Sequence, residues 1–415
     1  MFKLIYNLGI FLYAYTIRFI APYHRKAELL VNGHKSVFDK LRKEIDPQSK
    51  YIWIHAASLG EFEQGRPIIE NIKKNHPEYK ILLTFFSPSG YEIRKDYALA
   101  DVVSYLPFDK SRNVKRFLDI VKPYKAIFIK YEFWFNYIGQ LHKRNIPVYM
   151  VSAIFRPTQL FFRWYGGPSR NILRQYTTIC VQDEYSKTLL ASIGIEKNVA
   201  VCGDTRFDRV LDINSEAKIL PTVDSFTRSS NGEKIKTLVA GSSWPKDEEI
   251  FIQYFNKNKN LKLIVAPHEI HESHLSKIES LLERPFARLS NVAMENVSQY
   301  DCLIIDSFGL LSSVYRYGEV AYIGGGFGIG IHNVLEAAVY GMPVIFGPNF
   351  KKFREARELI ECGGAYCIHD YDTFISLMDE FMNYPEMLQS SSNAAGDYVK
   401  NNAGVVSKIM GIIQL

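Results

Sequence analysis

The chain has 415 residues, of which 47% are hydrophobic and 23% are charged. This composition excludes an intrinsically disordered chain and provides enough apolar side chains for two domains, each with its own core. The formal net charge is +6. Such a small excess of positive charge fits an anionic membrane surface or an anionic substrate, and it does not indicate a nucleic-acid partner.

The five cysteines do not form the pattern of a disulfide scaffold. Their number is odd, and three of them lie in or beside apolar runs, which is typical of reduced structural thiols in the cytosol. Neither Cys362 nor Cys367 has a nearby histidine or cysteine that would suggest zinc. We therefore expect neither a disulfide nor a zinc site.

The first segment, residues 1–25, is rich in aromatic and aliphatic side chains. Only fourteen residues separate Lys3 from Arg18, and Asn7 lies among them, so the stretch is short for a membrane span. An apolar, amphipathic segment followed by basic residues is expected to lie in the cytoplasmic face of a membrane. The alternatives are a core helix of the first domain and a tilted span with its positive charge inside. The basic residues are Arg25, Lys26, Lys35, Lys40, Arg42 and Lys43.

Short apolar runs then alternate with helix-like segments in two separate series. In residues 26–213 and again in 235–415 this alternation indicates a parallel sheet covered by helices. Residues 214–234 lose the periodicity and are predicted to be a linker. The strands expected in the first series are 51–55, 81–85, 102–106, 126–131, 148–152 and 177–182. Those expected in the second are 237–240, 261–266, 303–306, 320–323 and 344–346.

The predicted fold is therefore α/β, with two facing Rossmann-like domains and an N-terminal membrane-associating segment. The last stretch, residues 385–415, is predicted to be helical, and in such folds a C-terminal helix often returns to the first domain. Ligands of open α/β sheets bind beyond the carboxyl ends of the strands. A cleft between the two domains is the expected place of the active site.

The first candidate motif is Ala56-Ala57-Ser58-Leu59-Gly60-Glu61, directly after a predicted strand. Small residues at a strand-to-helix turn let a substrate approach the backbone. Glu61 stands at the start of the helix and is a candidate general base for a hydroxyl group. The alternative is a helix N-terminal acid that only interacts with the helix dipole.

Two further motifs are less specific. The turn Gly203-Asp204-Thr205-Arg206-Phe207-Asp208 precedes the linker, and Arg206 is a candidate to hold an anionic group. The alternative is a hinge with internal ion pairs. Gly241-Ser242-Ser243 follows a strand and precedes a helix, which suits a phosphate. An ordinary loop with helix-capping residues is equally compatible with it.

The segment from Gly324 to Gly330 carries the strongest signal. It contains five glycines in seven positions, follows a strand and precedes a helix expected to begin near Asn333. By composition and placement it is a phosphate-binding loop at a helix N-terminus. Glu336, one turn into that helix, is a candidate to bind sugar or ribose hydroxyl groups.

Three histidines, His268, His271 and His274, follow another predicted strand. Their spacing rotates them steadily around a helix, and no HExxH pair is present, so we expect no metal site. His268 comes directly after Pro267 at the strand end and is expected to face the cleft and touch the nucleotide or an acidic group of the donor.

Taken together, these motifs resemble the Kdo transferases, the 3-deoxy-D-manno-octulosonic acid transferases that use CMP-Kdo. The most specific parts are the Ser58-x-Gly60-Glu61 pair and His332-Asn333-x-Leu335-Glu336. The resemblance covers nearly the whole chain. The segments that carry it, in the family's order, are 51–61, 132–134, 203–208, 240–243, 267–268, 306–309 and 324–350.

The resemblance implies a glycosyltransferase B fold and an inverting transfer of Kdo from CMP-Kdo to a lipid A precursor. It places the enzyme at the cytoplasmic face of the inner membrane and implies no cofactor and no catalytic metal. Glu61 would be the general base, with Ser58, Gly60, Glu132 and Arg206 on the acceptor side or in the cleft. The residues implied to hold CMP-Kdo are Ser242, Ser243, His268, Gly324, Gly325, Gly326, Asn333 and Glu336.

The sequence departs from the family pattern at several positions. Lys130-Tyr131 replaces an acid-threonine pair, and Phe135 replaces a proline. His268 follows its proline without the usual arginine, and Leu310 stands where an acid is usual. These differences concern the donor contacts and the acceptor preference.

Three other functions are compatible with the same architecture. A nucleotide-sugar 2-epimerase would use a uridine nucleotide and needs no membrane segment. A transferase that uses a UDP-sugar and a lipid acceptor is the closest neighbour in chemistry. A non-catalytic membrane-bound scaffold is opposed by the intact Glu61 and the intact glycine-rich loop.

Overall fold

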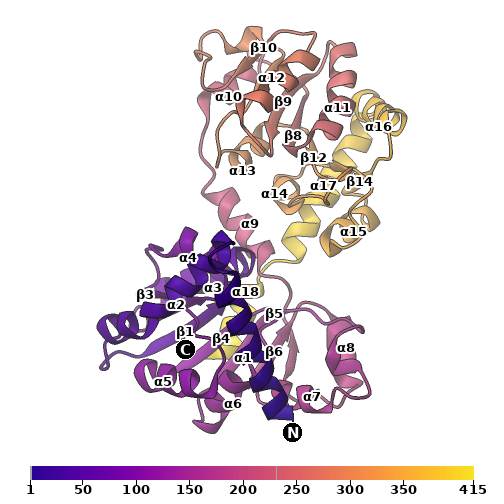
Figure 1. The fold of residues 1–415 in the computed structure, drawn as a ribbon. Coiled ribbons are helices and arrows are strands. Elements are labelled where there is room, and N and C mark those ends of the chain that lie inside the picture. The colour runs from indigo at the N-terminus through magenta and orange to yellow at the C-terminus, as the bar shows by residue number, and fades with distance from the viewer. Residues whose placement is uncertain (1, 230) are drawn as a thin grey trace. The chain divides into compact units, whose positions relative to one another are not determined.

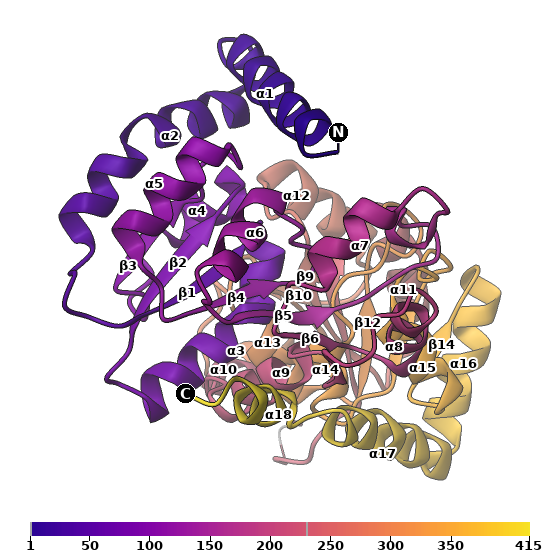
Figure 2. The same cartoon turned by 90° about the horizontal axis from the view of Figure 1, so that it is seen from below.

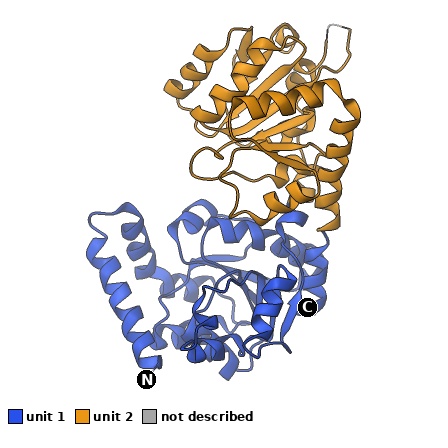
Figure 3. Ribbon diagram, turned by 90° about the vertical axis from the view of Figure 1, so that its right-hand side faces the viewer, with its two compact units in different colours: residues 1–209, 403–415 blue, residues 210–402 orange. Residues whose placement is uncertain are grey.

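The computed structural model describes residues 2–229 and 231–415. Two compact units make up the chain (Figure 3). Unit 1 comprises residues 1–209 and 403–415, and unit 2 comprises residues 210–402. The sequence predicts a linker between the two domains at residues 214–234. In the structure the first segment of unit 1 ends earlier, at Arg209, and residues 214–234 contain the end of helix α9 (Arg206–Ser215) and a further short helix, α10 (Pro221–Phe226).

Unit 1 is built on a seven-stranded parallel sheet (Figure 1). The spatial order is β3-β2-β1-β4-β5-β6-β7. Its strands are β1 (Tyr51–Ala56), β2 (Lys80–Phe85), β3 (Val102–Tyr105), β4 (Lys125–Ile129), β5 (Val148–Ala153), β6 (Thr178–Val181) and β7 (Val199–Val201). The helices are α1 (Phe2–Ile20), α2 (Arg25–Glu44), α3 (Leu59–Asn75), α4 (Pro88–Arg94), α5 (Ser111–Val121), α6 (Phe135–Lys143), α7 (Gly167–Leu173), α8 (Glu184–Ala191) and α18 (Val405–Ile413). Helix α9 (Arg206–Ser215) continues into unit 2.

Unit 2 repeats the same plan with a second seven-stranded parallel sheet in the order β10-β11-β9-β8-β12-β13-β14. Its strands are β8 (Thr237–Ser243), β9 (Lys262–Pro267), β10 (Phe286–Arg288), β11 (Cys302–Ile304), β12 (Val320–Ile323), β13 (Val344–Phe346) and β14 (Ala365–Cys367). Besides α10, the helices are α11 (Pro245–Lys257), α12 (Glu272–Leu281), α13 (Leu311–Val314), α14 (Leu335–Ala338), α15 (Arg354–Glu361), α16 (Tyr371–Asn383) and α17 (Pro385–Asn401). Two parallel α/β units confirm the predicted fold class.

The central strands explain why the alternation was readable in the sequence. All six residues of β1 and all six of β9 are buried, because helices cover both faces of a parallel sheet. Such strands appear as continuous apolar runs. The three-residue strands β7, β10 and β14 were not predicted, whereas the equally short β11 and β13 were; all residues of β11 and β13 are buried, while β7, β10 and β14 are mostly half-buried and so lack a continuous apolar run.

Helices α1 and α2 form a bent pair on one side of unit 1 (Figure 2). Helix α1 leaves much of its apolar surface in solvent; Leu4 is 75% and Phe19 is 70% exposed. Among the described residues, no single helix is both long and apolar enough to cross a membrane. The two helices pass that test only as a pair, with a bend of 115° between them.

A buried carboxylate holds α1 against the rest of unit 1. The Tyr6 hydroxyl donates a hydrogen bond of 2.6 Å to Asp109 Oδ2. Asp109 also accepts the backbone N–H groups of Asn136 and Tyr137, each at 3.0 Å. Burial raises the pKa of Asp109 to about 7, although all three hydrogen bonds act in the opposite direction.

The C-terminal helix α18 packs within unit 1 and is fixed at both of its ends. At its N-terminus, Asp208 accepts the backbone N–H groups of Gly404 and Val405, at 2.9 and 3.0 Å. At its C-terminus, Lys125 Nζ donates to the carbonyl oxygens of Ile413 and Gln414, both at 2.6 Å. An acid at the N-terminus and a cation at the C-terminus both complement the helix dipole.

We predict that Asp109 makes the stability of unit 1 depend on pH. The pKa of a carboxyl group that is raised in the folded state favours folding at low pH, and this contribution is lost as the pH rises towards 7. Relative to Asp109→Asn, the wild type should lose roughly 2–3 kcal/mol of unfolding free energy between pH 5 and pH 8, at about 1.4 kcal/mol per pKa unit. Urea unfolding followed by tryptophan fluorescence measures this, because Trp53, Trp134 and Trp164 all lie in unit 1. Parallel pH profiles for the two proteins would contradict it.

Candidate functional site

Each sheet has a central point where the strand order reverses. In unit 1 the chain moves outward in opposite directions from β1 and β4, and in unit 2 from β8 and β12. Crossover helices leave a crevice at such a switch point, beyond the carboxyl ends of the two strands, and ligands of α/β sheets bind there. The predicted residues of unit 1 and of unit 2 gather mainly at these two points, and each group is described by itself.

In unit 1, Ser58 and Glu61 lie together at the turn between β1 and α3. Ser58 occupies the N-cap position of α3, but its hydroxyl does not cap the helix. It donates instead to Glu61 Oε2, one turn further on. The Glu61 side chain is 20% exposed, so it is held by a neighbour and still accessible to a substrate. Gly60, beside them, is exposed. A Cβ at this position would find its nearest atom, Ser58 Oγ, at 3.8 Å, so the space above the turn is open.

Lys130 approaches the same carboxylate from the end of β4. It is the first residue after the strand and has a positive φ of 70°. Its Nζ lies 3.9 Å from Glu61 Oε1. The strained backbone of a non-glycine residue is typical of functional sites. The sequence identified Lys130 only as a departure from the family pattern, and its position directly after a strand was the signal that could have placed it at the site.

Glu132 is the centre of a buried hydrogen-bond network at the same edge of the sheet. His55 Nδ1 contacts the carbonyl oxygen of Thr84 at 3.0 Å, and its Nε2 lies 3.1 Å from Glu132 Oε2. Trp134 Nε1 donates to the same carboxylate oxygen, and the Tyr176 hydroxyl donates to the Glu132 carbonyl oxygen. Through these hydrogen bonds Glu132 fixes the loop after β4. Because Glu132 is only 5% exposed, its carboxylate has little surface left for a substrate.

The turn before α9 contains the internal ion pair that the sequence offered as an alternative. Arg206 Nε and Nη2 lie 2.9 and 2.8 Å from Asp204 Oδ2, and Asp204 is 4% exposed. The Arg206 side chain is itself 34% exposed. Its guanidinium group is thus oriented by a buried carboxylate and remains partly exposed.

In unit 2, Ser242 and Ser243 end strand β8 and point to different surroundings. Ser242 has a positive φ of 52° and is partly exposed. The Ser243 hydroxyl is buried and donates to Glu248 Oε1 at 2.8 Å, which differs from the predicted contact with the donor. Glu248 Oε2 in turn contacts His274 Nε2 at 3.0 Å. Ser243 therefore anchors α11 through a buried polar chain.

The glycine-rich loop after β12 is shaped by close backbone contacts. A Cβ on Gly324 would lie 2.2 Å from the Ser242 carbonyl oxygen, and one on Gly326 would lie 2.4 Å from the Gly347 nitrogen. Gly325 has a φ of 92°. Its N–H donates to the buried carboxylate of Asp247 at 2.8 Å, so this amide of the predicted phosphate loop is already occupied.

Asp247 ties three elements of unit 2 together. Besides the Gly325 amide it accepts the Trp244 N–H at 3.0 Å and the Tyr322 hydroxyl at 2.9 Å. Burial raises the pKa of Asp247, and these three hydrogen bonds oppose the shift. The carboxylate thus holds the glycine-rich loop, the start of α11 and strand β12 in one arrangement.

Three aromatic rings line the neighbouring strand ends. The exposed His268 ring stacks on both Trp244 and His332, with centroid distances of 4.8 and 4.5 Å. Trp244 Nε1 donates to His332 Nε2 at 3.2 Å, so that this nitrogen carries no proton. Burial, followed by the nearby His268, lowers the pKa of His332. A flat, partly exposed stack of this kind suits a planar or anionic group.

Asn333 and Glu336 form a pair at the start of α14, a helix of only four residues. The Asn333 side chain accepts the Leu335 N–H at 3.2 Å and donates to Glu336 Oε1 at 2.8 Å. Asn333, one residue before the N-cap Val334, thus orients the Glu336 carboxylate and binds the first N–H of the helix. The helix begins two residues later than predicted.

One cluster among the described residues has the composition of a metal site. Glu269, His271 and His274 offer ligand atoms within 4.8 Å of one another. However, His274 Nδ1 contacts the Glu269 carbonyl oxygen at 2.9 Å, and its Nε2 contacts Glu248. Both ring nitrogens of His274 are therefore engaged, which argues against this cluster as a metal site.

Sequence reasoning missed Trp244, Asp247 and His332 as well as Lys130. Trp244 directly follows Ser243 and Asp247 lies in the first turn of α11, so inspection of the start of this helix would have shown both. His332 was noted as part of a family motif and given no role. The stacking of His332 on His268 could not be predicted from any local sequence pattern, because 64 positions separate the two residues in the chain.

Comparison with known proteins gives a consistent result. The family described as 3-deoxy-D-manno-octulosonic-acid transferase (kdotransferase) matches residues 33–209. The chain is 31% identical to a 3-deoxy-D-manno-octulosonic acid transferase of Aquifex aeolicus over 323 residues, which are 76% of this chain and 80% of the relative. It is 27% identical to the protein of that name from Haemophilus influenzae over 383 residues, 89% of this chain and 87% of the relative.

Among solved structures the similarity concerns the fold. UDP-GlcNAc 2-epimerase from Neisseria meningitidis matches with a TM-score of 0.63 at 16% identity, covering 88% of this chain and 99% of the epimerase. MurG from Acinetobacter baumannii matches with a TM-score of 0.53 at 11% identity, covering 88% and 99%. Both an epimerase and MurG therefore share this two-unit architecture, and fold alone does not separate their activities.

We predict that Gly324 tolerates no side chain, whereas Gly328 does. In Gly324→Ala the new Cβ would meet the backbone of Ser242 and Ser243 at 2.2 and 2.5 Å, so the loop or strand β8 must move. Overpacking of this kind should destabilise unit 2 by about 1–3 kcal/mol. Gly328→Ala is the matched control, because its Cβ would find its nearest atom at 3.9 Å. Urea unfolding followed by circular dichroism compares the two variants, and equal losses would contradict the close-approach argument.

Proposed function

Because the chain belongs to the 3-deoxy-D-manno-octulosonic acid transferase family and is a glycosyltransferase, we propose that it moves Kdo from CMP-Kdo to a lipid A precursor, with inversion at the anomeric carbon. The observation that carries the mechanism is the accessible Glu61 carboxylate at the switch point of unit 1, held by Ser58 and close to Lys130. The residues proposed to bind the donor lie at the end of strand β8 or follow strands β9 and β12 of unit 2.

In the proposed reaction Glu61 acts as the general base. A hydroxyl oxygen of the acceptor forms a bond to the anomeric carbon of Kdo while the bond from that carbon to the phosphate oxygen of CMP breaks. The hydroxyl proton passes to Glu61, and CMP leaves as an anion. The Ser58 hydroxyl donates to this carboxylate and Lys130 lies beside it, and together they fix its direction, which is the positioning that an inverting displacement requires.

The residues proposed to hold the donor act through backbone shape and through charge. Gly324–Gly326 pack closely against the backbone of Ser242, Gly330 and Gly347, and this packing sets the shape of the loop that is proposed to meet a phosphate together with Ser242. The stack formed by Trp244, His268 and His332 is proposed to receive the planar or anionic part of the donor. Glu336, oriented by Asn333, is proposed to bind ribose or sugar hydroxyl groups.

We further propose that α1 rests on the anionic cytoplasmic face of the inner membrane. Its exposed apolar side chains would contact lipid, while the basic residues of α2 would meet phosphate groups. This arrangement brings a lipid acceptor to the unit that carries Glu61.

Replacement of Glu61 tests the proposed base. Glu61→Gln keeps the shape of the side chain and can still accept the Ser58 hydrogen bond, but it cannot take a proton. Transfer of radiolabelled Kdo from freshly generated CMP-Kdo to a tetraacylated lipid A precursor should fall by about 10²- to 10⁴-fold in kcat. Glu63→Gln is the control, because Glu63 lies on the same helix and its carboxylate pairs with Arg94 at 2.9 Å.

The outcomes separate the parts of the proposal. Equal activity of wild type and Glu61→Gln would keep the transferase and remove Glu61 as the base. No product from the folded wild type would reject CMP-Kdo or the lipid A precursor as substrate. A parallel assay with UDP-GlcNAc then tests the 2-epimerase and the UDP-sugar transferase alternatives.

The membrane proposal predicts a selective loss of lipid binding. Replacing Leu4, Leu8 and Phe11 together by serine removes three apolar side chains that are 75%, 58% and 54% exposed. Co-sedimentation with vesicles containing anionic lipid should weaken by at least about tenfold, because each buried apolar side chain contributes about 1.5–3 kcal/mol. CMP binding should not change. Ile93→Ser, a residue of α4 that is 58% exposed, serves as the control, and unchanged sedimentation of the triple variant would reject the proposal.

A further inference from the structure

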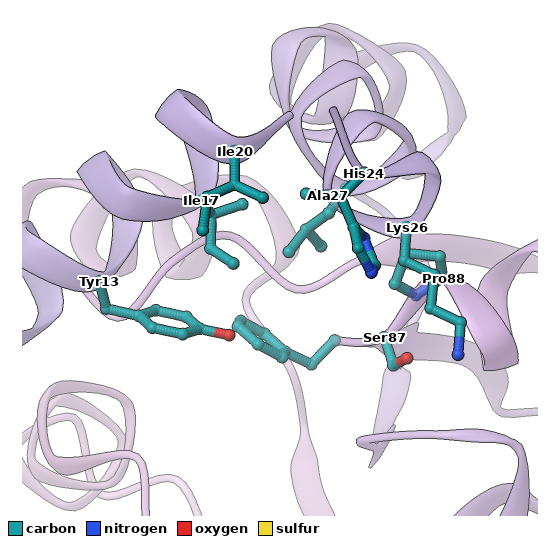
Figure 4. A pocket seen from close by; sticks show the side chains of 10 residues that line it. Tyr13, Ile17, Ile20, His24, Lys26, Ala27, Ser87 and Pro88 are labelled. Carbon is teal, nitrogen blue, oxygen red and sulfur yellow. The ribbon is translucent and has the colours of Figure 1, made fainter. Parts of the chain in front are cut away.

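Unit 1 contains an apolar pocket that none of the proposed catalytic or donor residues lines. Its volume is about 350 Å³, within the range of small-molecule sites. Helix α1 contributes Tyr13, Ile17 and Ile20, helix α2 contributes Ala27 and Leu30, and Phe86 closes it from the end of β2 (Figure 4). A concave apolar surface that stays open between two helices is costly in water unless an apolar ligand fills it.

The pocket has a cationic side. His24 and Lys26, both exposed, belong to its lining near the turn between α1 and α2. Neighbouring Arg25 pairs with Glu28 at 2.9 Å, whereas Lys26 has no carboxylate partner among the described residues. A molecule that places a tail between the helices would therefore meet positive charge beside the pocket, which favours an anionic amphiphile.

Ser87 and Pro88, which lie on the same side of the pocket as Lys26 (Figure 4), join it to the loop that carries Glu61. Both residues follow β2, the neighbour of β1 in the sheet. The Ser87 N–H donates to the Ala57 carbonyl oxygen at 2.7 Å, and Ala57 directly precedes Ser58. In addition, the Phe86 ring packs on Trp134 at a centroid distance of 4.9 Å. A tail in the pocket would thus leave its polar end next to the carboxyl edge of β1.

We infer that this pocket binds one acyl chain of the lipid acceptor and so positions the acceptor hydroxyl for Glu61. The inference rests on the proposed function, because it takes the acceptor to be an anionic lipid. Three observations support this occupant: an apolar lining, a free cation beside the lining, and continuity with the Ser58–Glu61 loop. The exposed apolar face of α1 gives the chain a route from the bilayer into the pocket.

The test is to fill the pocket and vary the acyl chains of the acceptor. Ile17→Trp places a bulky ring in the lining, and Ile20→Trp repeats the test at a residue that is 39% exposed and therefore tolerant of change. The full chain is assayed with a tetraacylated lipid A precursor and with its fully deacylated form. For the tetraacylated acceptor we expect KM to rise about tenfold, the effect of removing about two methylene groups from an apolar site. For the deacylated acceptor KM should stay unchanged.

Leu12→Trp is the matched control, since Leu12 lies on α1, is 54% exposed and does not line the pocket. An equal rise in KM for both acceptors, or the same rise in Leu12→Trp, would overturn the inference. Absence of transfer by the wild type would reject the proposed function instead. Equilibrium binding of the tetraacylated precursor without CMP-Kdo then still decides the pocket. Weaker binding to Ile17→Trp than to Leu12→Trp supports it, and equal binding rejects it.

Discussion

Parallel strands of one sheet all end on the same edge, and both candidate sites depend on that constraint. In unit 1 it brings Glu61, after β1, within reach of Lys130, after β4. In unit 2 it sets the loops after β8, β9 and β12 side by side. Because the strand order reverses between β1 and β4 and between β8 and β12, the crossover helices diverge at these places and leave the strand ends open to a ligand. The chemistry of each site is therefore carried by loops, while buried strands fix their positions.

Buried carboxylates hold these loops in place. Glu132 fixes the loop after β4, Asp247 fixes the glycine-rich loop, and Glu248 connects β8 to α12 through His274. Each carboxylate is almost fully removed from water and accepts two or more hydrogen bonds. Loss of such an acceptor would leave several buried donors without partners, which is costlier than loss of one exposed contact. The accessible groups, Glu61 and His268, thus rest on a rigid polar frame.

The bent pair of α1 and α2 joins the proposed lipid contact to the site of unit 1. One side of α1 docks through the Tyr6–Asp109 hydrogen bond, and the other side exposes apolar residues. The apolar pocket between the helices opens where these two roles meet. A helix that only anchored the protein would not need a lined cavity joined to the catalytic loop. The arrangement is understandable if the same element that contacts lipid also selects the part of a lipid that reaches Glu61.

The sequence by itself determined the fold class, the family and most strand positions, because buried parallel strands and glycine-rich turns leave local patterns. It indicated Glu61 and the loop from Gly324 to Gly330 for the same reason. Only the tertiary structure decided that Ser243 points inward to Glu248, that the Gly325 amide is taken by Asp247, and that Lys130 approaches Glu61. It also decided that Ile17 and Ala27 line one pocket with Ser87. These facts depend on contacts between residues far apart in the chain, and no local pattern of residues records which strand end or helix face a side chain will meet.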